Sequence, residues 1–401
     1  MTRISRSAFV RGLGAAGAAT AMPPVRAAAA AQAPRLQRLI DGYVRENPRL
    51  ANLAIVAGVV RPDAPQGVLV FGGAPVAARD HARRITLDGN TTFLIGSNTK
   101  CFTSRIYAAR QKDYGKTLGQ CITAPLPQRL RDVPIVDLAN YSSGFPTDNA
   151  PPIWWNETIN ATTLATLLQS LNAHPSVPAC APGANYSYSN FSWGLMGLAA
   201  LGVSSPSQPV AEQWAQAVAE LGGAIGLSPA SRPWSPSTYN DLPAGYASGS
   251  LFPEDQDYGG PNWLTMGGGG NLASNGNDML RWLRYNMGVL GLDLPLLIEQ
   301  QQRTWTWTTK SPQAAGVTAC VASSMRSPVT TSLGWFHASP PWNPAVRFLT
   351  KNGGVKGFSS WMGFGRWAGS GSPAKTGLFV LANAPRTADV IGARALRALL
   401  S

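Results

Sequence analysis

The chain has 401 residues, of which 44% are hydrophobic and 13% are charged, so it can bury a large core as one two-lobed domain or two closely packed ones. This composition excludes a disordered tail. The formal net charge of +13 favours anionic surroundings such as a cell envelope, or substrates with a carboxylate, but the basic residues form no cluster interleaved with aromatic side chains, so no nucleic-acid partner is expected.

The first 33 residues are typical of an export signal. They carry Arg3, Arg6 and Arg11, a mild apolar run rich in alanine and glycine, and small residues suited to a cleavage site. The segment SRSAFVRG resembles a twin-arginine signal in which Ser7 stands at the second arginine, so the export route stays open. We therefore expect residues 1–33 to be removed on export and residues 34–401 to form the mature domain, in the periplasm or outside the cell.

The first part of the chain predicts one helix and two strands, followed by a long region of helices and loops. Residues 36–49 have the apolar spacing of an amphipathic helix, and residues 53–60 and 67–73 are strand-like, with a turn-rich connector suited to an antiparallel hairpin. From residue 97 to about residue 330 the pattern is mostly that of helices and long loops. No later apolar run reaches the roughly 18 residues needed to span a bilayer, so the mature chain is expected to be soluble.

The C-terminal part of the chain returns to short strands. The segments VRFLTKNGG, SSWMGFG and TGLFVLANA are β-like, and residues 388–400 form a final amphipathic helix. Strands at both ends with helices between them predict an α+β fold, in which an antiparallel sheet is built from the two termini and a mostly helical lobe, about residues 100–330, is inserted. The functional site is expected in the cleft between the two lobes.

Cysteines and histidines limit the chemistry that the chain can perform. The four cysteines permit up to two disulfides in three connectivities, or small buried side chains instead: Cys101, Cys121, Cys180 and Cys320. Three isolated histidines make a zinc site improbable: His81, His174 and His337. We expect neither a metal nor an organic cofactor.

The segment SNTK, Ser97 to Lys100, carries the first candidate catalytic pair. A serine hydroxyl needs a partner that takes its proton, and the chain contains no G-x-S-x-G motif of the kind that works with a histidine. The S-x-x-K spacing instead places a lysine one helical turn from the serine, and burial beside another cation would lower the pKa of that lysine so that it acts as a base. Phe102, Ile106 and Ala109 form an apolar stripe that would anchor this helix in the core.

A second S-x-x-K copy occurs near the C-terminus and is interpreted as accidental. It is SPAK, Ser372 to Lys375, and it continues as KTG. Pro373 and the strand-like residues that follow exclude the helical turn that would bring the serine and the lysine together.

Two further motifs follow Ser97 in a fixed order: YSN, Tyr188 to Asn190, in a loop leading into a helix, and KNG, Lys351 to Gly353, on a strand. With these three motifs the sequence resembles the serine β-lactamase and penicillin-binding protein family, specifically class C β-lactamases and their DD-peptidase and esterase relatives. The resemblance extends from about Phe93 to the C-terminus. It implies a β-lactamase/transpeptidase-like fold for residues 34–401.

The resemblance also implies a role for each motif residue. Ser97 is similar to the acylated nucleophile, and Lys100 to the neighbour that helps to deprotonate it. Tyr188 would share the base role and pass a proton to the leaving group, and Asn190 would hold the substrate amide and Lys100. Lys351 would make the Tyr188 hydroxyl more acidic and attract the substrate carboxylate.

The third motif departs from the family pattern. The usual motif is K-T-G, in which threonine gives a hydroxyl to the substrate carboxylate, whereas this chain has Asn352, whose amide donates from a different place. Asn352, Gly353 and Gly354 are expected to bind substrate, and the backbone N–H groups of Ser97 and Gly354 to form an oxyanion hole. The KTG sequence at residues 375–377 belongs to the last strand and does not replace it.

These expectations together describe an exported serine hydrolase that forms an acyl-enzyme and acts on D-Ala-D-Ala-type peptides or on β-lactams. Two alternatives stay open: a carboxylesterase on the same scaffold, and a non-catalytic, penicillin-sensing envelope protein, to which Asn352 gives some weight. The expected partner is a small-molecule or peptide substrate, and a monomer is expected.

Overall fold

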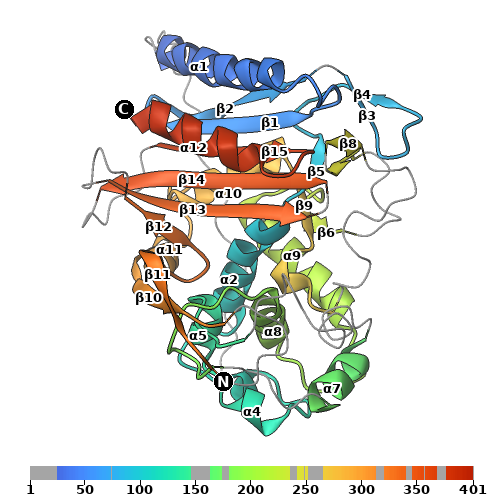
Figure 1. Ribbon diagram of the computed structural model, residues 1–401, viewed down its shortest axis with the longest axis vertical. Helices are drawn as coiled ribbons and strands as arrows, with labels where there is room; N and C mark the ends of the chain where they lie inside the picture. The colour runs from blue at the N-terminus through green and yellow to red at the C-terminus, as the bar shows by residue number, and fades with distance from the viewer. Residues whose placement is uncertain are drawn as a thin grey trace, which may run out of the picture.

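A single large sheet and a group of helices make up most of the fold (Figure 1). The structure is a computed structural model. It describes residues 25–73, 75–145, 163–173, 180–234, 242–247, 249–251, 265–312, 320–339, 346–355, 357–367 and 376–400.

The sheet has eight strands, and every neighbouring pair in it is antiparallel. In spatial order the strands are β10 (Trp305–Lys310), β11 (Ser323–Thr331), β12 (Phe336–Ala338), β13 (Val346–Val355), β14 (Phe358–Trp367), β15 (Thr376–Ala382), β1 (Ile55–Arg61) and β2 (Ala64–Gly72).

The two ends of the chain meet near one edge of this sheet, next to the edge strand β2. Strand β1 pairs with β15, with Ala57 opposite Val380, and on its other side with β2 in the predicted hairpin. All residues of β15 and all but the last of β1 are buried, because helices cover both faces of the sheet. The predicted α+β fold, with a sheet assembled from both termini, is confirmed.

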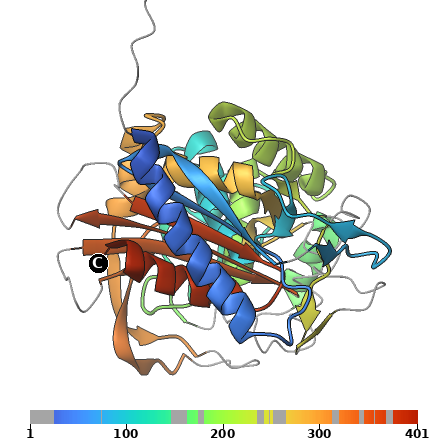
Figure 2. The same ribbon diagram turned by 90° about the horizontal axis from the view of Figure 1, so that it is seen from above.

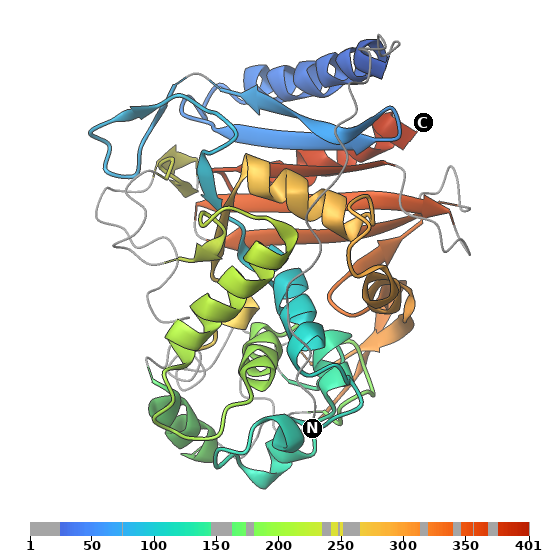
Figure 3. The ribbon, with the colours of Figure 1, turned by 180° about the vertical axis from the view of Figure 1, so that it is seen from behind.

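Helices pack on both faces of the sheet. Helices α1 (Val25–Glu46) and α12 (Thr387–Leu400) lie side by side on one face (Figure 2). Helix α10 (Gly276–Asn286) covers β1, β2 and β15 from the opposite face (Figure 3). The sheet therefore separates a small outer core, under α1 and α12, from the main core that continues into the helical region.

The remaining elements form the helical region and three small sheets. The helices are α2 (Thr99–Arg110), α3 (Leu118–Cys121), α4 (Gln128–Arg131), α5 (Ile135–Ala139), α7 (Leu164–Ala173), α8 (Asn190–Leu201), α9 (Val210–Ile225) and α11 (Leu294–Gln302), with 3-10 turns η1 (Gly96–Asn98) and η3 (Gly267–Gly269). The small sheets pair β3 (Val76–Ala77) with β4 (Arg84–Ile85), β9 (Leu272–Asn275) with β5 (Thr92–Leu94) and β6 (Arg232–Pro233), and β7 (Tyr246–Ala247) with β8 (Ser250–Leu251).

Helix α2 lies at the centre of the helical region. All of its residues from Thr99 to Ala108 are buried, so the helix has neighbours on every side rather than along one stripe. Phe102 stacks on Trp282 of α10, with ring centroids 3.9 Å apart, which ties α2 to the helix that lies on the sheet. The prediction for Ala109 is wrong: it is exposed, because the helix leaves the core in its last turn.

Two sequence expectations differ from the structure in their boundaries. Strands β10 and β11 lie inside the range assigned to the helical lobe, but they extend the large sheet because an alternating segment such as WTWTTK suits an edge strand better than a helix. Helix α1 begins at Val25, so its first turns overlap the expected export signal, whose residues 1–24 lie outside the described part of the chain. Among the described residues no helix has the length and apolarity to cross a membrane.

Candidate active site

Ser97 lies in η1, immediately before α2, at the junction between the large sheet and the helical region. Its side chain is half-buried. The turn and the first turn of α2 present Ser97 and Lys100 to each other, and the Lys100 amine donates a 2.9 Å hydrogen bond to Ser97 Oγ. The S-x-x-K spacing therefore produces the contact that the sequence predicted.

Lys100 is completely buried and is held by three oxygen acceptors. Besides Ser97 Oγ, its Nζ donates to Asn190 Oδ1 at 2.5 Å and to the carbonyl oxygen of Gly269 in η3 at 2.5 Å. A buried ammonium group is costly unless it is hydrogen-bonded, and these oxygens supply the compensation. The same three hydrogen bonds hold the Lys100 side chain in the rotamer that places its amine at Ser97.

Tyr188 reaches Ser97 from the loop that precedes α8. Its hydroxyl donates a 2.7 Å hydrogen bond to Ser97 Oγ, so this oxygen has a phenol on one side and the Lys100 amine on the other. The adjacent Ser189 caps α8 by accepting a hydrogen bond from the Ser192 backbone N–H. Because the cap fixes where the helix starts, it also fixes Asn190, the first helical residue, opposite Lys100.

Lys351, on β13, is the second buried lysine at this junction. Only 1% of its surface is exposed, and its Nζ lies 5.6 Å from the centre of the Tyr188 ring, while Lys100 Nζ lies 5.1 Å from the same centre. Burial lowers the pKa of Lys351 to about 8, although Cys101 and Asp389 act in the opposite direction. The tyrosine ring therefore lies within about 6 Å of two amines, and burial lowers the pKa of one of them.

The glycines of the third motif allow β13 to approach the serine turn. A Cβ atom on Gly353 would lie 2.0 Å from the carbonyl oxygen of Ile95 and 2.9 Å from the backbone nitrogen of Ser97. On the other side, Gly96 has φ +49°, and a Cβ atom there would lie 2.8 Å from the nitrogen of Gly354. Because only glycine permits this approach, the backbone amides of residues 97 and 354 come close together, as an oxyanion hole requires.

Asn352 extends outward from β13 and is exposed. Its Nδ2 donates a 2.8 Å hydrogen bond to Oδ1 of Asp389, in the first turn of α12. On the opposite side of the same amide, Lys351 Nζ lies 3.5 Å from Asn352 Oδ1, and it donates a 2.5 Å bond to the Asn352 carbonyl oxygen. The residue that replaces the threonine of the family motif is thus already paired within the chain.

All eight residues expected at the site lie in the described part of the chain. The structure joins Ser97, Lys100, Tyr188 and Asn190 by direct hydrogen bonds and places Lys351 above the Tyr188 ring. Asn352, Gly353 and Gly354 follow on the same strand. Their catalytic and binding roles stay predictions. The second S-x-x-K copy, residues 372–375, lies outside the described residues, and Thr376 and Gly377 belong to β15 as expected.

Two contributors to the site were not found in the sequence. The Gly269 carbonyl accepts from Lys100, but a backbone oxygen leaves no signal in a sequence. Tyr141 stacks on Tyr188, with centroids 5.6 Å apart and planes 11° from parallel, and its hydroxyl donates to the Gly334 carbonyl oxygen at 2.9 Å. Its φ of +65°, unusual for a non-glycine residue, marks a backbone that the surrounding structure holds in place.

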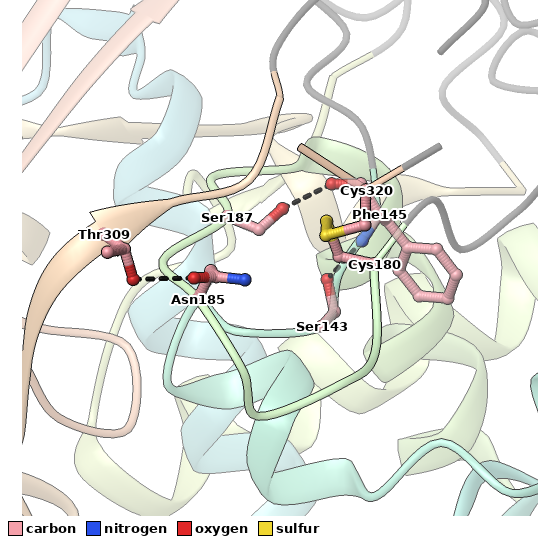
Figure 4. The surroundings of a disulfide bond; sticks show 7 residues. All are labelled: Ser143, Phe145, Cys180, Asn185, Ser187, Thr309 and Cys320. Atoms are coloured by element: carbon pink, nitrogen blue, oxygen red, sulfur yellow. Dashed lines mark hydrogen bonds between the residues drawn. A yellow bond between two sulfur atoms is a disulfide. The ribbon is translucent and has the colours of Figure 1, made fainter. Parts of the chain in front are cut away.

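A disulfide bond fastens the loop that carries Tyr188. Cys180 and Cys320 are joined, and Cys101 and Cys121 are free and buried, which selects one of the pairings that the sequence left open. Figure 4 shows that polar contacts surround this bond: Ser187 Oγ donates to the Phe145 carbonyl oxygen. The bond connects the segment before Tyr188 with the segment that leads into β11.

Breaking this disulfide is expected to loosen the fold. The cysteines are 140 residues apart, so opening the bond frees a long loop, and we expect the free energy of unfolding to fall by about 2–5 kcal/mol. Thermal unfolding with and without a reductant measures this, with thiol titration to confirm reduction. The double variant Cys180→Ser/Cys320→Ser is the control and should not respond to the reductant. An unchanged melting temperature in fully reduced wild-type protein would contradict the prediction.

No metal-binding cluster lies at the site. Within the part of the chain that the structure describes, no group of three or more His, Cys, Asp or Glu side chains gathers closely enough to hold a metal ion. Burial raises the pKa of the Cys101 thiol to about 12, so this cysteine beside Lys100 remains a thiol at neutral pH. The groups available for chemistry are the hydroxyls, amines and amides named above.

The family model described as Beta-lactamase matches residues 41–401. No curated protein sequence gives a match.

Several solved structures share the fold. A β-lactamase/D-alanine carboxypeptidase from Pseudomonas syringae has a TM-score of 0.65 at 18% identity, covering 92% of this chain and 99% of that one. A class C β-lactamase in complex with cefoxitin has a TM-score of 0.64 at 18% identity, covering 92% and 99%. An octameric penicillin-binding protein homologue from Pyrococcus abyssi has a TM-score of 0.64 at 18% identity, covering 92% and 77%. At this identity the likeness shows the fold alone.

Proposed function

This chain belongs to the beta-lactamase family, and from that premise we propose that it is a serine hydrolase in which Ser97 forms an acyl-enzyme. The observation that carries the proposal is the shared hydrogen bonding of Ser97 Oγ, which contacts the Lys100 amine at 2.9 Å and the Tyr188 hydroxyl at 2.7 Å. A serine so placed can lose its proton to either neighbour when that neighbour is deprotonated.

The reaction then proceeds in two halves. Ser97 Oγ attacks the carbonyl carbon of the substrate while its proton passes to the Lys100 and Tyr188 pair, and the negative charge that develops on the carbonyl oxygen is stabilised by the backbone N–H groups of residues 97 and 354. The bond to the leaving group breaks as Tyr188 returns a proton to it. Water attacks the resulting ester of Ser97, the same groups take and return its proton, and the acid product leaves.

Two substrate classes fit this chemistry. The names of the structurally similar enzymes, a β-lactamase/D-alanine carboxypeptidase and a class C β-lactamase in complex with cefoxitin, favour β-lactams and D-alanyl peptides, in which the scissile bond is an amide. A carboxylesterase is the second candidate, and the pairing of Asn352 with Asp389 favours it because both amide-bond substrates carry a carboxylate that the third motif normally binds. A non-catalytic penicillin sensor would keep the groups that form the acyl-enzyme but would not hydrolyse it.

One experiment separates these functions. The purified protein is incubated with a fluorescent penicillin, a chromogenic cephalosporin and a short-chain nitrophenyl ester. Rapid cephalosporin turnover indicates a lactamase, stable penicillin labelling a peptidase or sensor, and ester turnover alone an esterase. Failure of the protein to react with any of the three would overturn the acyl-enzyme proposal.

The pH dependence of the reaction should reflect the protonation state of Lys351. Its pKa is lowered to about 8, so below that pH the amine is charged and supports the developing negative charge at Tyr188, and above it the charge is lost. We expect kcat/KM for an uncharged ester to fall on the alkaline side with an apparent pKa near 8. In Lys351→Arg this limb should move above pH 10, because a guanidinium group stays charged. An alkaline limb at the same pH in the variant would contradict the role of Lys351.

Export is proposed on separate grounds. The N-terminal arginines and small residues support it, and so does the Cys180–Cys320 disulfide, because such bonds persist in oxidising compartments outside the cytoplasm. The N-terminal sequence of protein recovered after expression in a bacterial host tests this, and an unprocessed N-terminus in a cytoplasmic fraction would contradict it. The monomeric state also stays a prediction.

A further inference from the structure

Asp389 brings a negative charge to the substrate-binding end of β13. It belongs to the first turn of α12, and its Oδ1 accepts the 2.8 Å hydrogen bond from Asn352 Nδ2. The turn is fixed to the sheet by Ser359 of β14, whose Oγ accepts a hydrogen bond from the Ala388 backbone N–H at 3.0 Å and donates to the Ala384 carbonyl oxygen at 2.6 Å. Asp389 is therefore held beside the third motif rather than swinging freely in solvent.

The Asp389 carboxylate changes the electrostatic environment that a bound substrate would meet beside Lys351. Asp389 raises the pKa of Lys351 and Lys351 lowers that of Asp389, so the two groups interact electrostatically. Burial raises the pKa of Asp389, while the Asn352 hydrogen bond, Lys351 and the exposed Arg386 favour its charged form. The Lys351 amine, which would attract a substrate carboxylate, therefore already interacts with the Asp389 carboxylate of the chain itself.

The position of this pair defines which part of a substrate it meets. Tyr188 contacts Ser97 Oγ, Lys351 Nζ lies over the Tyr188 ring and donates to the Asn352 carbonyl oxygen, and Asn352 donates to Asp389, so one chain of contacts leads from the nucleophile through Tyr188 to Asp389. In the proposed reaction Tyr188 returns a proton to the leaving group, so the leaving group is the part of the substrate that this chain of contacts meets. The charge carried by the leaving group is therefore the charge that interacts electrostatically with Asp389.

An acidic residue in the first turn of a helix also has a simpler explanation, because it stabilises the helix dipole. That explanation accounts for Asp389 at the start of α12. It gives no reason for the Asn352 amide to donate to Asp389 with its nitrogen while its oxygen faces Lys351. This arrangement occupies one of the two N–H donors that the amide could otherwise offer to a substrate carboxylate.

We propose that Asp389 is a specificity-determining residue that makes the site reject leaving groups with a carboxylate and accept uncharged or positively charged ones. The inference rests on the proposed acyl-enzyme function. It names the substrate class as esters or amides whose leaving group lacks a negative charge, in contrast to D-Ala-D-Ala peptides and β-lactams.

Three matched substrates test the proposal: phenyl acetates whose meta position carries a carboxylate, a carboxamide or a trimethylammonium group. Each kcat/KM is divided by the rate of hydroxide-catalysed hydrolysis of the same ester, which removes differences in intrinsic reactivity. For the wild type we expect the carboxylate ester to be at least about 10-fold poorer than the carboxamide ester, since like charges placed together are strongly unfavourable. Asp389→Asn should raise the carboxylate-to-carboxamide ratio about 10-fold and lower the trimethylammonium-to-carboxamide ratio.

Asp63→Asn is the matched control. It removes the same charge at the opposite end of the strands, in the turn between β1 and β2, where Asp63 pairs with Arg61 at 3.1 Å. This variant should leave both ratios unchanged. If Asp389→Asn unfolds, as a melting curve would reveal, Asp389→Ser keeps a side chain suited to the first turn of a helix and carries the same expectation.

The results for the specificity and for the reaction itself can be told apart. Ser97→Ala must abolish hydrolysis of the carboxamide ester; if it does not, the proposed function fails. If Ser97 is required but the wild type hydrolyses the carboxylate ester as well as the carboxamide ester, only the role of Asp389 is wrong. A change of ratio that Asp63→Asn reproduces would equally overturn that role, because it would come from net charge alone.

Discussion

Replacing Ser97 with alanine should lower kcat for every accepted substrate by at least about 10,000-fold, because the acyl-enzyme has no other oxygen on which to form. The side chain is half-buried and contributes little to packing, so the variant should remain folded. Two measurements check this: steady-state turnover of an uncharged ester, and the mass of the intact protein after brief exposure to substrate. Wild-type protein should gain the mass of one acyl group and the variant none.

Ser104→Ala is the control for this experiment. Ser104 lies in α2, about two turns after Ser97, but its hydroxyl contacts the Tyr114 hydroxyl at 2.8 Å and the Leu333 carbonyl oxygen at 3.0 Å, not the site. The control should lower the melting temperature and leave the adduct in place. An adduct or undiminished turnover in Ser97→Ala would show that another residue is the nucleophile.

Lys100→Met is the second change with a large expected effect. Methionine has nearly the length of lysine but no amine, so the variant removes one of the two groups that can take the Ser97 proton. General-base catalysis is worth about 100- to 10,000-fold, and we expect kcat/KM to fall by that range while KM changes little. Asn190 Oδ1 and the Gly269 carbonyl lose their lysine donor, which costs about 1–3 kcal/mol for each group left unsatisfied.

The stability loss and the catalytic loss need separate measurements. Rates are compared at a temperature well below the unfolding midpoint of the variant, which is determined independently. Lys116→Met serves as the control, because the Lys116 amine donates a 3.2 Å hydrogen bond to Gln111 Oε1 at the C-terminal end of α2, whereas Ser97 and Lys100 lie at its N-terminal end. If the Lys100→Met variant is folded and keeps near-wild-type kcat/KM, the prediction is contradicted, and Tyr188 alone acts as the base.

The serine and lysine pair could be predicted because both residues lie on one local turn. A separation of three residues on a helix fixes the distance between two side chains almost regardless of the rest of the fold. Tyr188 and Lys351 are different: their motifs gave residue types and order, and only the resemblance to a known family suggested that they meet. In the structure an inter-strand pairing and a capped helix bring them to Ser97.

Other features depended on contacts that no local pattern encodes. The four cysteines allowed several pairings, and the bond between Cys180 and Cys320 follows from the chain path around Tyr188. The prediction of Ala109 in the apolar stripe was wrong because helix periodicity says which residues share a face, not where the surrounding core ends. Asn352 was recognised as a departure from the family pattern, but its partner lies 37 residues later in another element.

The sequence by itself determined the local structure: the β1–β2 hairpin, the C-terminal strands and helix, and the helical turn that joins Ser97 to Lys100. It also determined an overall positive charge, which on its own would favour anionic substrates. Only the tertiary structure decided the environment of Lys351, because burial and the approach of Asp389 from α12 set its charge. Local periodicity acts over a few residues, whereas desolvation and electrostatic pairing depend on which distant segments the folded chain brings together.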